Sequence, residues 1–351
     1  MKKVAIITIQ SRNYGNRLQN YALQEIIKSF GLQVDTLRRG KKPKRKEQIK
    51  RNFKYFFQKL LKTKGAKFTR FEKNIKKSSL YITANNAPKE LNDKYDYFVV
   101  GSDQVWNPYY EFLGKVDLLY FADNRKKIAY AASFGVDELP DSEEVKYKKY
   151  LKKFASISVR EEAGAKIVNA LIEENVPVVL DPTMLLSASQ WEKVEKKPEC
   201  FPKQKYVLIY SLGTRSQEFK DTIAKVKEKK CYRVIDILER KHNGLEYPIG
   251  PAEFIFMLHY AELILTDSFH AAVFSILFHK KVQVFNREDQ KLNSRIINLF
   301  KMCGLEKNMK IGCFDIGGTE DFSIVDEKIE INKKKSIDYL KKSLSINEVS
   351  P

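Results

Sequence analysis

The residues best suited to chemistry follow an apolar run in the last third of the chain. Residues 263–265 are apolar, and the polar residues 266–268 come directly after them. Small and apolar residues then recur with the spacing of a helix, whose first turn contains His270. Such a turn lies at the carboxyl end of a buried strand, where open α/β sheets bind their ligands. Helix N–H groups and the His270 imidazole are expected to bind an anion there or to transfer a proton.

A second candidate is the carboxylate of Asp103, in the first half of the chain. The strand predicted at residues 95–100 ends in a glycine and Ser102, and Asp103 follows. Its carboxylate is expected to act as a general base on a hydroxyl group, with capping of the next helix as the alternative. Trp106 and Asn107 would supply a stacking surface and a hydrogen-bond partner for a sugar. The alternative for Trp106 is a core position.

Two arginines are candidate anion ligands. Arg160 directly follows the strand predicted at residues 156–159, and a guanidinium at the carboxyl edge of a sheet suits a carboxylate or a phosphate. The alternative is an ion pair between Arg160 and Glu161 or Glu162. Arg295 precedes a predicted helix and is a second candidate, with a solvated helix face as the alternative.

The polar start of the predicted first helix adds further candidates for substrate binding. Gly15, Asn16 and Gln19 suit a close approach of a ligand to the backbone, and ordinary helix capping is the alternative. The stretch lacks the G-x-G-x-x-G pattern, so it gives little support to dinucleotide binding. Three further residues follow predicted strands and belong to the same set: Ser133, Ser268 and Phe269.

Charge and cysteine content limit the function classes. The formal net charge is +20, which suits nucleic acid, an anionic membrane or an anionic substrate; a general excess of lysine is the alternative. Residues 38–70 concentrate basic residues around an apolar helical pattern. That pattern suits an anionic bilayer or, alternatively, packing against its own domain. The four cysteines form no C-x-x-C pair and have no suitably spaced histidines, so we expect neither a structural zinc site nor a disulfide framework. We also expect no metal and no cofactor.

Strands and helices are expected to alternate along the chain, which predicts α/β domains with doubly wound sheets. The predicted elements include a strand at 176–180 and a last helix at 337–344. The apolar residues 4–9 are expected to form a strand and not a signal peptide, and no run approaches the ~20 apolar residues of a membrane span. We therefore expect a cytoplasmic protein, with peripheral contact at the inner face of the cell membrane. The expected domains are an N-terminal domain at 1–190 with a basic helical insertion at about 38–77, a C-terminal domain at 191–330, and a helix and tail at 331–351.

Together these stretches resemble the polysaccharide pyruvyl transferase family, from about residue 4 to about residue 305. The resemblance implies a GT-B-like fold of two Rossmann-like domains that face each other across a cleft. It also implies transfer of pyruvate from phosphoenolpyruvate to sugar hydroxyls, as a ketal, on a cell-surface polysaccharide or its lipid-linked precursor. The motifs that carry it are Asn13-Tyr14-Gly15-Asn16, Gly101-Ser102-Asp103-Gln104-Val105-Trp106-Asn107, Tyr130-Ala131-Ala132-Ser133-Phe134-Gly135, Ser158-Val159-Arg160-Glu161, Asp181-Pro182-Thr183 and Thr266-Asp267-Ser268-Phe269-His270.

One departure from the family concerns the donor. Family members tend to carry Arg-Leu-His where this chain has Ser268-Phe269-His270, so that arginine has no counterpart at Ser268. On this basis we expect His270, the helix N–H groups and Arg295 to bind the phosphate of phosphoenolpyruvate. Arg160 is expected to bind a donor anion, and Asp103 to take the proton of the attacking hydroxyl. Cationic side chains and helix ends supply the charge that this chemistry needs.

Two other function classes compete with this one. A GT-B glycosyltransferase with a nucleotide-sugar donor has the same architecture, because a fold does not fix a function. A nucleic-acid binder would use the +20 charge, but it would leave His270 and Arg160 unexplained. We therefore expect phosphoenolpyruvate and a glycan or lipid-linked glycan as partners, and no nucleic acid.

Overall fold

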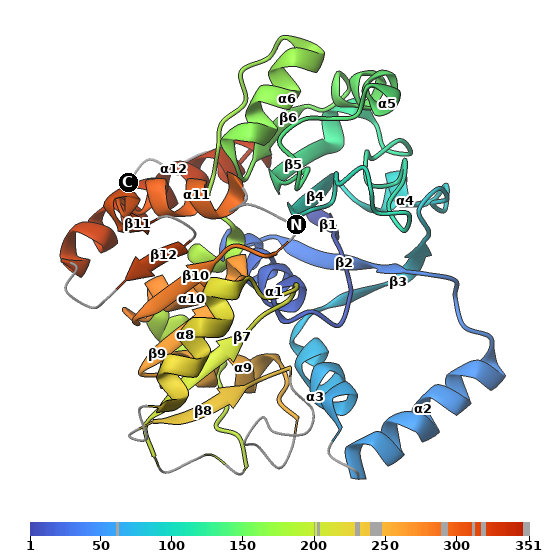
Figure 1. The fold of residues 1–351 in the computed structure, drawn as a ribbon. Coiled ribbons are helices and arrows are strands. Elements are labelled where there is room, and N and C mark those ends of the chain that lie inside the picture. Colours follow the sequence, from blue (N-terminus) through green and yellow to red (C-terminus); the bar gives the residue numbers. More distant parts are fainter. Residues whose placement is uncertain are drawn as a thin grey trace. The chain divides into compact units, whose positions relative to one another are not determined.

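The structure, a computed structural model, describes most of the chain (Figure 1). Two compact units divide it: unit 1 comprises Met1–Asn52, Glu72–Leu185 and Glu330–Pro351, and unit 2 comprises Phe53–Phe71 and Leu186–Ile329. The chain therefore enters unit 2 twice, and its C-terminal segment returns to unit 1. The described residues are 1–60, 63–199, 201, 204–228, 232–238, 248–288, 294–310, 313–316 and 321–346.

Unit 1 contains a six-stranded, fully parallel sheet in the order β3-β2-β1-β4-β5-β6. This order reverses direction between β1 and β4, and in such sheets the carboxyl ends of the two strands at the reversal bind the ligand. The central strands β1, β4 and β5 are buried along almost their whole length, as apolar runs in a parallel sheet require. The strands are β1 (Lys3–Ile7), β2 (Gln33–Arg39), β3 (Lys77–Ile82), β4 (Tyr97–Asp103), β5 (Lys127–Ala132) and β6 (Ser156–Val159).

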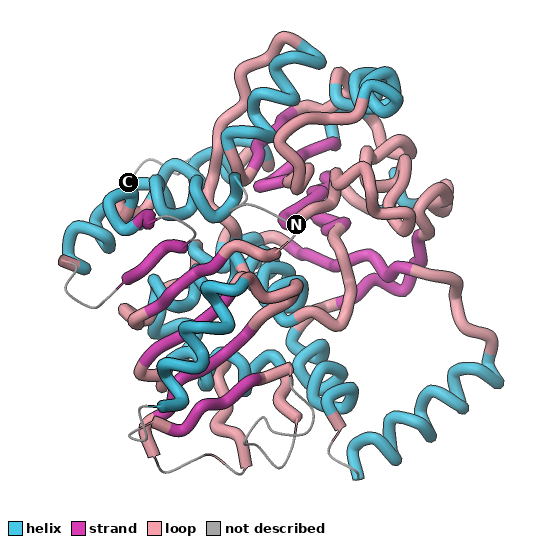
Figure 2. Tube along the Cα trace, viewed as in Figure 1, coloured by secondary structure: helices cyan, strands magenta, loops and turns pink. Residues whose placement is uncertain are grey.

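Helices pack against the sheet of unit 1. Figure 2 shows helices in cyan and strands in magenta. The core of unit 1 forms where Tyr147, Leu151, Ile167 and Val168 pack against sheet residues such as Phe98. This packing orients the helices that lead into and out of the carboxyl edge of the sheet. The α-helices that lie wholly within unit 1 are α1 (Tyr14–Ser29), α4 (Leu91–Lys94), α5 (Asp141–Leu151) and α6 (Glu162–Ile172).

Unit 2 contains a second six-stranded sheet, in the order β11-β12-β10-β9-β7-β8. Its centre is parallel, but β12 pairs antiparallel with both β10 and β11, so this sheet is mixed and not purely parallel. The strands are β7 (Tyr206–Tyr210), β8 (Arg233–Asp236), β9 (Leu263–Thr266), β10 (Val282–Phe285), β11 (Met309–Lys310) and β12 (Cys313–Ile316). The helices are α7 (Ala188–Glu192), α8 (Gln217–Glu228), α9 (Pro251–His259), α10 (Phe269–Leu277) and α11 (Ser294–Met302).

Two predicted elements differ from the observed ones. Residues 176–180 form no strand and make only an isolated parallel bridge, between Val178 and Val159. Pro177 has no N–H to donate and Pro182 follows closely, so the segment cannot extend its pairing. The helix predicted at 337–344 is the last part of α12 (Phe322–Ser343).

The apolar stripe of α12 contains a polar residue, which explains the short prediction. Val325, Ile329, Leu340 and Leu344 are buried at helical spacing, but Ser336 occupies the stripe between them and is also buried. Ser336 Oγ accepts a hydrogen bond from the backbone N–H of Leu180 at 3.0 Å. The remaining helices, α2 (Arg45–Leu60) and α3 (Lys64–Phe71), lie in the predicted basic insertion between β2 and β3. Among the helices described, none is long and apolar enough to cross a membrane.

Gly101, inside β4, is a position where the sheet tolerates no side chain. Its φ is +122°, and a Cβ there would lie 2.1 Å from the carbonyl oxygen of Tyr130 in β5. Gly31 also has a positive φ, +76°, but a Cβ there would meet no atom within 4 Å. The close approach of β4 to β5 therefore requires glycine two residues before Asp103.

We predict that Gly101→Ala destabilises the protein by about 3 kcal/mol or more, because both the positive φ and the overlap with Tyr130 must be relieved. Gly31→Ala is the matched control and should cost about 1 kcal/mol, since only its φ is unfavourable. Denaturant unfolding of the two purified variants measures the difference. Equal losses of stability in both would contradict this account of the strand pair.

Candidate functional site

Asp103 ends β4 beside the start of α1, at the reversal of strand order in unit 1. Its backbone is left-handed, with φ +74°. One carboxylate oxygen accepts a hydrogen bond from Asn16 Nδ2, and the other accepts one from the backbone N–H of Gln104 at 2.9 Å. Asn16 in turn accepts a hydrogen bond from Ser11 Oγ. The structure thus brings together two residues that the sequence placed 87 positions apart.

Arg160, directly after β6, lies among three carboxylates. Its Nη1 is 2.9 Å from Asp181 Oδ2, its Nη2 is 3.4 Å from Asp103 Oδ1, and its Nε is 3.7 Å from Glu161 Oε2. The arginine side chain is 2% exposed, the side chains of Asp181 and Glu161 are fully buried, and that of Asp103 is 11% exposed. In the structure Arg160 pairs with carboxylates, which was the alternative to anion binding.

The electrostatics of this carboxylate cluster (Asp103, Glu161 and Asp181 with Arg160) keep the arginine charged. Burial alone would lower the pKa of Arg160, but the three carboxylates outweigh burial and raise the pKa above its ordinary value. With every group ionised, these four side chains carry a formal charge of −2. Such an edge suits a hydroxyl donor or a developing positive charge better than it suits a second anion.

Polar side chains hold the buried carboxylates in place. Ser133 Oγ donates to Glu161 Oε1 at 2.6 Å, and Ser102 Oγ donates to Asp181 Oδ2 at 2.8 Å. The other oxygen of Asp181 accepts from the backbone and the hydroxyl of Thr183, at 3.0 and 2.7 Å. The predicted residues Ser102 and Ser133 therefore contact the cluster, and Gln19 lies 3.3 Å from Ser102 Oγ.

Trp106 and Asn107 have mainly structural contacts. Trp106 is buried, its ring packs against Phe134 at 5.3 Å, and its Nε1 donates to the carbonyl of Asp117 at 3.0 Å. Asn107 donates to Gln104 Oε1 at 3.2 Å. Trp106 thus occupies a core position, the alternative that the sequence left open. Gly15, the remaining candidate of unit 1, is buried in the first turn of α1.

In unit 2, the predicted strand–turn–helix is confirmed as β9 followed by α10. Ser268 is the N-cap of α10: its Oγ accepts from the backbone N–H of Ala271 at 3.5 Å, and its own N–H donates to Thr266 Oγ1 at 3.0 Å. His270 is buried in the first turn of the helix, with its ring centroid 5.3 Å from that of Phe269. Ser268, Phe269 and His270 therefore lie together at the carboxyl edge of the unit 2 sheet.

Two arginines at this edge were not singled out from the sequence. Arg287 lies two residues after the end of β10, and its Nε donates to Asp267 Oδ2 at 3.1 Å. Asp267 also accepts from the backbone N–H of Gly213 at 2.8 Å, which fixes the loop after β7. Arg215, on that loop, is paired with Asp236. Both arginine side chains are partly exposed. An arginine two residues after an apolar run was the signal that could have identified Arg287.

The other predicted residues lie elsewhere. Arg295 lies in the first turn of α11, a helix that contacts α10, and it is half-buried. His259 lies 3.0 Å from Glu195, and the exposed His279 lies 2.9 Å from Asp326. His242 lies outside the described residues. Within the described part of the chain, no three His, Cys, Asp or Glu side chains are arranged to hold a metal ion.

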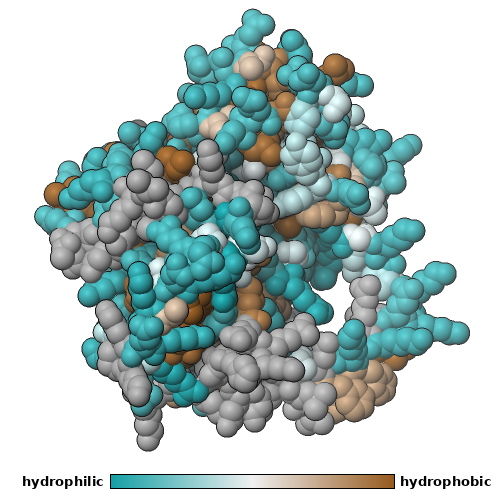
Figure 3. Space-filling view, viewed as in Figure 1, coloured by the Kyte–Doolittle hydropathy of each residue, from teal (hydrophilic) through white to brown (hydrophobic). Residues whose placement is uncertain are grey.

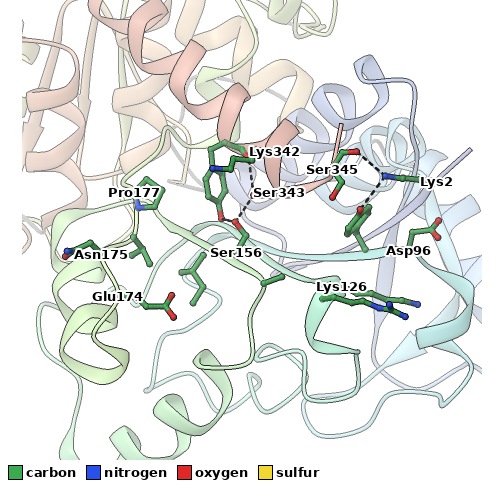
Figure 4. A pocket seen from close by; sticks show the side chains of 16 residues that line it. Lys2, Asp96, Lys126, Ser156, Glu174, Asn175, Pro177, Lys342, Ser343 and Ser345 are labelled. Carbon is green, nitrogen blue, oxygen red and sulfur yellow. Dashed lines mark hydrogen bonds between the residues drawn. The ribbon is translucent and has the colours of Figure 1, made fainter. Parts of the chain in front are cut away.

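A cavity of about 990 Å³ lies at the opposite, amino-terminal ends of β1, β4 and β6 in unit 1 (Figure 4). The end of α12 forms one wall, where Ser343 Oγ and the Tyr339 hydroxyl contact Ser156 at 2.8 and 2.9 Å. Lys2 Nζ donates to the carbonyl of Ser345 at 3.1 Å. These contacts attach the C-terminal helix to the sheet, and the cavity is separate from the edge that carries Asp103.

Comparisons with known proteins identify relatives in sequence and in fold. A family model described as polysaccharide pyruvyl transferase matches residues 13–290. No curated protein matches the sequence. The co-structure of S. aureus MnaA with UDP has 13% identity and a TM-score of 0.54, over 100% of this chain and 99% of that chain.

Two further structures give a similar result. The UDP-GlcNAc 2-epimerase from Methanocaldococcus jannaschii has 14% identity and a TM-score of 0.54, over 99% of this chain and 100% of that chain. A putative UDP-N-acetylglucosamine 2-epimerase from Listeria monocytogenes has 11% identity and a TM-score of 0.52, over 98% and 91%. At such identities the likeness concerns the fold alone. It confirms the predicted GT-B-like class with two Rossmann-like units.

We predict that Arg160→Met destabilises the protein by about 3–5 kcal/mol at neutral pH, because it leaves buried carboxylates without their cation. The loss should shrink as the pH falls, since the uncompensated carboxylates then bind protons in the folded state. Unfolding of the wild type and the variant as a function of pH tests this. Arg125→Met, at an exposed arginine of the same unit, is the control, and an Arg160→Met loss that is no larger or is independent of pH would refute the assignment.

Proposed function

Because the chain belongs to the polysaccharide pyruvyl transferase family, as its motifs predicted, we propose that it transfers pyruvate from phosphoenolpyruvate to two hydroxyls of a sugar. Family membership also places it among the transferases. In the proposal, the acceptor is a cell-surface polysaccharide or its lipid-linked precursor, and the reaction takes place in the cytoplasm, at the inner face of the membrane. The observation that carries the proposal is that three carboxylates surround one arginine at the strand edge of unit 1, whereas the strand edge of unit 2 has a helix N-terminus with His270 in its first turn.

The unit 2 edge suits the donor. Phosphoenolpyruvate carries a phosphate and a carboxylate, and both need positive partners. We assign the phosphate to His270 and to the N–H groups of the first turn of α10, where the helix dipole favours an anion. Arg295, as expected from the sequence, is a further candidate, and the structure adds Arg287. Ser268 caps the helix in this assignment, so the cation that the family carries at that position is supplied by other residues.

The unit 1 edge suits the acceptor. We propose that Asp103, the most exposed of the three carboxylates, takes the proton of the attacking hydroxyl. Asn16 and Arg160 hold its carboxylate, so Arg160 acts through Asp103 and not as a ligand of the donor anion. Gly15, Gln19, Ser102, Ser133 and Asn107 border or support this edge, and in unit 2 Phe269 supports the first turn of α10.

The chemistry balances as follows in this proposal. A sugar hydroxyl oxygen bonds to the central carbon of phosphoenolpyruvate, and a proton added to the methylene carbon makes it a methyl group. The bond from the central carbon to the phosphate oxygen then breaks, and inorganic phosphate leaves with the electron pair. A second hydroxyl of the same sugar closes the ketal on the oxocarbenium-like carbon, whose positive charge the carboxylate cluster stabilises. Of the two hydroxyl protons, one ends on the new methyl group and the other on the departing phosphate.

We predict that the wild type converts a glycan acceptor and phosphoenolpyruvate into a pyruvyl ketal and inorganic phosphate, observed by mass spectrometry. Asp103→Asn removes the base and His270→Gln removes the imidazole that binds the phosphate, so each should slow the reaction by about 100-fold or more. His279→Gln is the control, because this exposed histidine follows the C-terminal end of α10, where it contacts Asp326 and stacks on Phe322.

Two results would count against the proposal. Wild-type rates in Asp103→Asn and His270→Gln, with both variants folded, would remove these residues from the mechanism. Product formed from UDP- or CMP-sugars, with none from phosphoenolpyruvate, would instead favour a glycosyltransferase of the same fold.

A further inference from the structure

Helix α2 presents an apolar face that its own chain leaves uncovered. Ile49, Phe53, Phe56 and Phe57 are 49%, 63%, 62% and 56% exposed. Their spacing places them on one side of the helix, within a sector about 100° wide. Figure 3 shows the corresponding hydrophobic patch over this helix. Packing of the apolar face against its own domain, the alternative considered from the sequence, is therefore not observed.

Positive charge surrounds this face. Residues 41–70 contain 13 lysines and arginines and one acidic residue, Glu47, so they carry a formal +12 of the chain's +20. At helical spacing Lys50 and Lys54 lie along one side of the apolar face and Arg45 lies along the other, and all three are exposed. Long basic side chains at the borders of an apolar helix face can extend their charges to polar headgroups while the apolar face enters the lipid.

We propose that α2 docks on the surface of an anionic lipid bilayer, with its phenylalanines at the boundary between headgroups and acyl chains. The charges distinguish this occupant from the alternatives. A second copy of α2 would bring two strongly basic helices together, and like charges oppose that contact. A nucleic acid would neutralise the lysines but would leave the three phenylalanines in water. An anionic bilayer satisfies both the charges and the apolar face.

Docking of α2 on a bilayer has a consequence for the acceptor, and this consequence rests on the proposed function. A transferase held at an anionic bilayer meets acceptors that are anchored in the same surface. The acceptor class that this favours is therefore the lipid-linked glycan precursor and not the released polysaccharide. Binding of α2 to lipid does not itself depend on pyruvyl transfer.

The test is co-sedimentation of the full-length protein with vesicles, without donor or acceptor. Vesicles of phosphatidylglycerol and phosphatidylcholine should bind the protein, with an affinity that falls as salt rises, and vesicles of phosphatidylcholine alone should bind it far less. Two variants separate the apolar contribution from the charge contribution. A triple variant, Phe53→Ser, Phe56→Ser and Phe57→Ser, removes the apolar face. A double variant, Lys50→Glu and Lys54→Glu, reverses the flanking charge. Each should weaken binding by about tenfold or more.

Matched controls carry the same changes at exposed positions elsewhere. Val145→Ser, Ile324→Ser and Ile331→Ser replace three exposed apolar residues of α5 and α12, and Lys225→Glu with Lys227→Glu reverses two exposed charges on α8. These variants should bind vesicles within about twofold of the wild type. Equal binding by the α2 variants and their controls, or no binding to anionic vesicles, would overturn the proposal. So would a change from dimer to monomer in the phenylalanine variant with vesicle binding unchanged, because the occupant would then be a second copy.

Activity measurements separate this inference from the proposed function. Both α2 variants should retain wild-type turnover on a water-soluble acceptor and lose it on a lipid-linked acceptor embedded in anionic vesicles. Absence of pyruvyl transfer on every acceptor would refute the proposed function, while the sedimentation result would still decide whether α2 binds the bilayer.

Discussion

One guanidinium among three carboxylates is the interaction on which the carboxyl edge of unit 1 depends. Arg160 follows β6, Asp103 ends β4, and Asp181 precedes the turn at Pro182–Met184, so the contacts join three separate segments of the chain. Burying these charges costs several kcal/mol per ion unless they are paired and hydrogen-bonded. The serine and threonine hydroxyls around them supply the remaining hydrogen bonds. The cluster therefore fixes the position of Asp103 more firmly than a surface loop would.

In the proposed function the two strand edges serve different partners, the hydroxyl in unit 1 and the anion in unit 2. In unit 1, carboxylates outnumber the arginine that they surround, which suits proton removal and a developing positive charge. In unit 2, a helix N-terminus, His270 and the partly exposed Arg287 suit a phosphate. Both edges lie at the carboxyl ends of parallel strands, so the same rule of α/β folds positions each set.

The sequence was most informative where apolar runs end in polar residues. The bounds of β6 agree with the predicted ones, and Arg160, which was singled out, follows this strand directly. The sequence was less informative about contacts between residues that are far apart along the chain. Asp103 and Asp181 lie 57 and 21 residues from Arg160, so no local pattern revealed that they pair with it. The role of Arg287 depends in the same way on Asp267, which lies 20 residues away, directly after β9.

The central claim is that the carbon skeleton of phosphoenolpyruvate moves to sugar hydroxyls while its phosphate leaves intact. Phosphoenolpyruvate with heavy oxygen in the bridge between carbon and phosphorus tests this most directly. Mass spectrometry of the glycan and of the released phosphate then shows which bond breaks. The account predicts a pyruvyl ketal without the label and inorganic phosphate that carries it. Label retained in the carbon product, or labelled phosphate without a ketal, would contradict it.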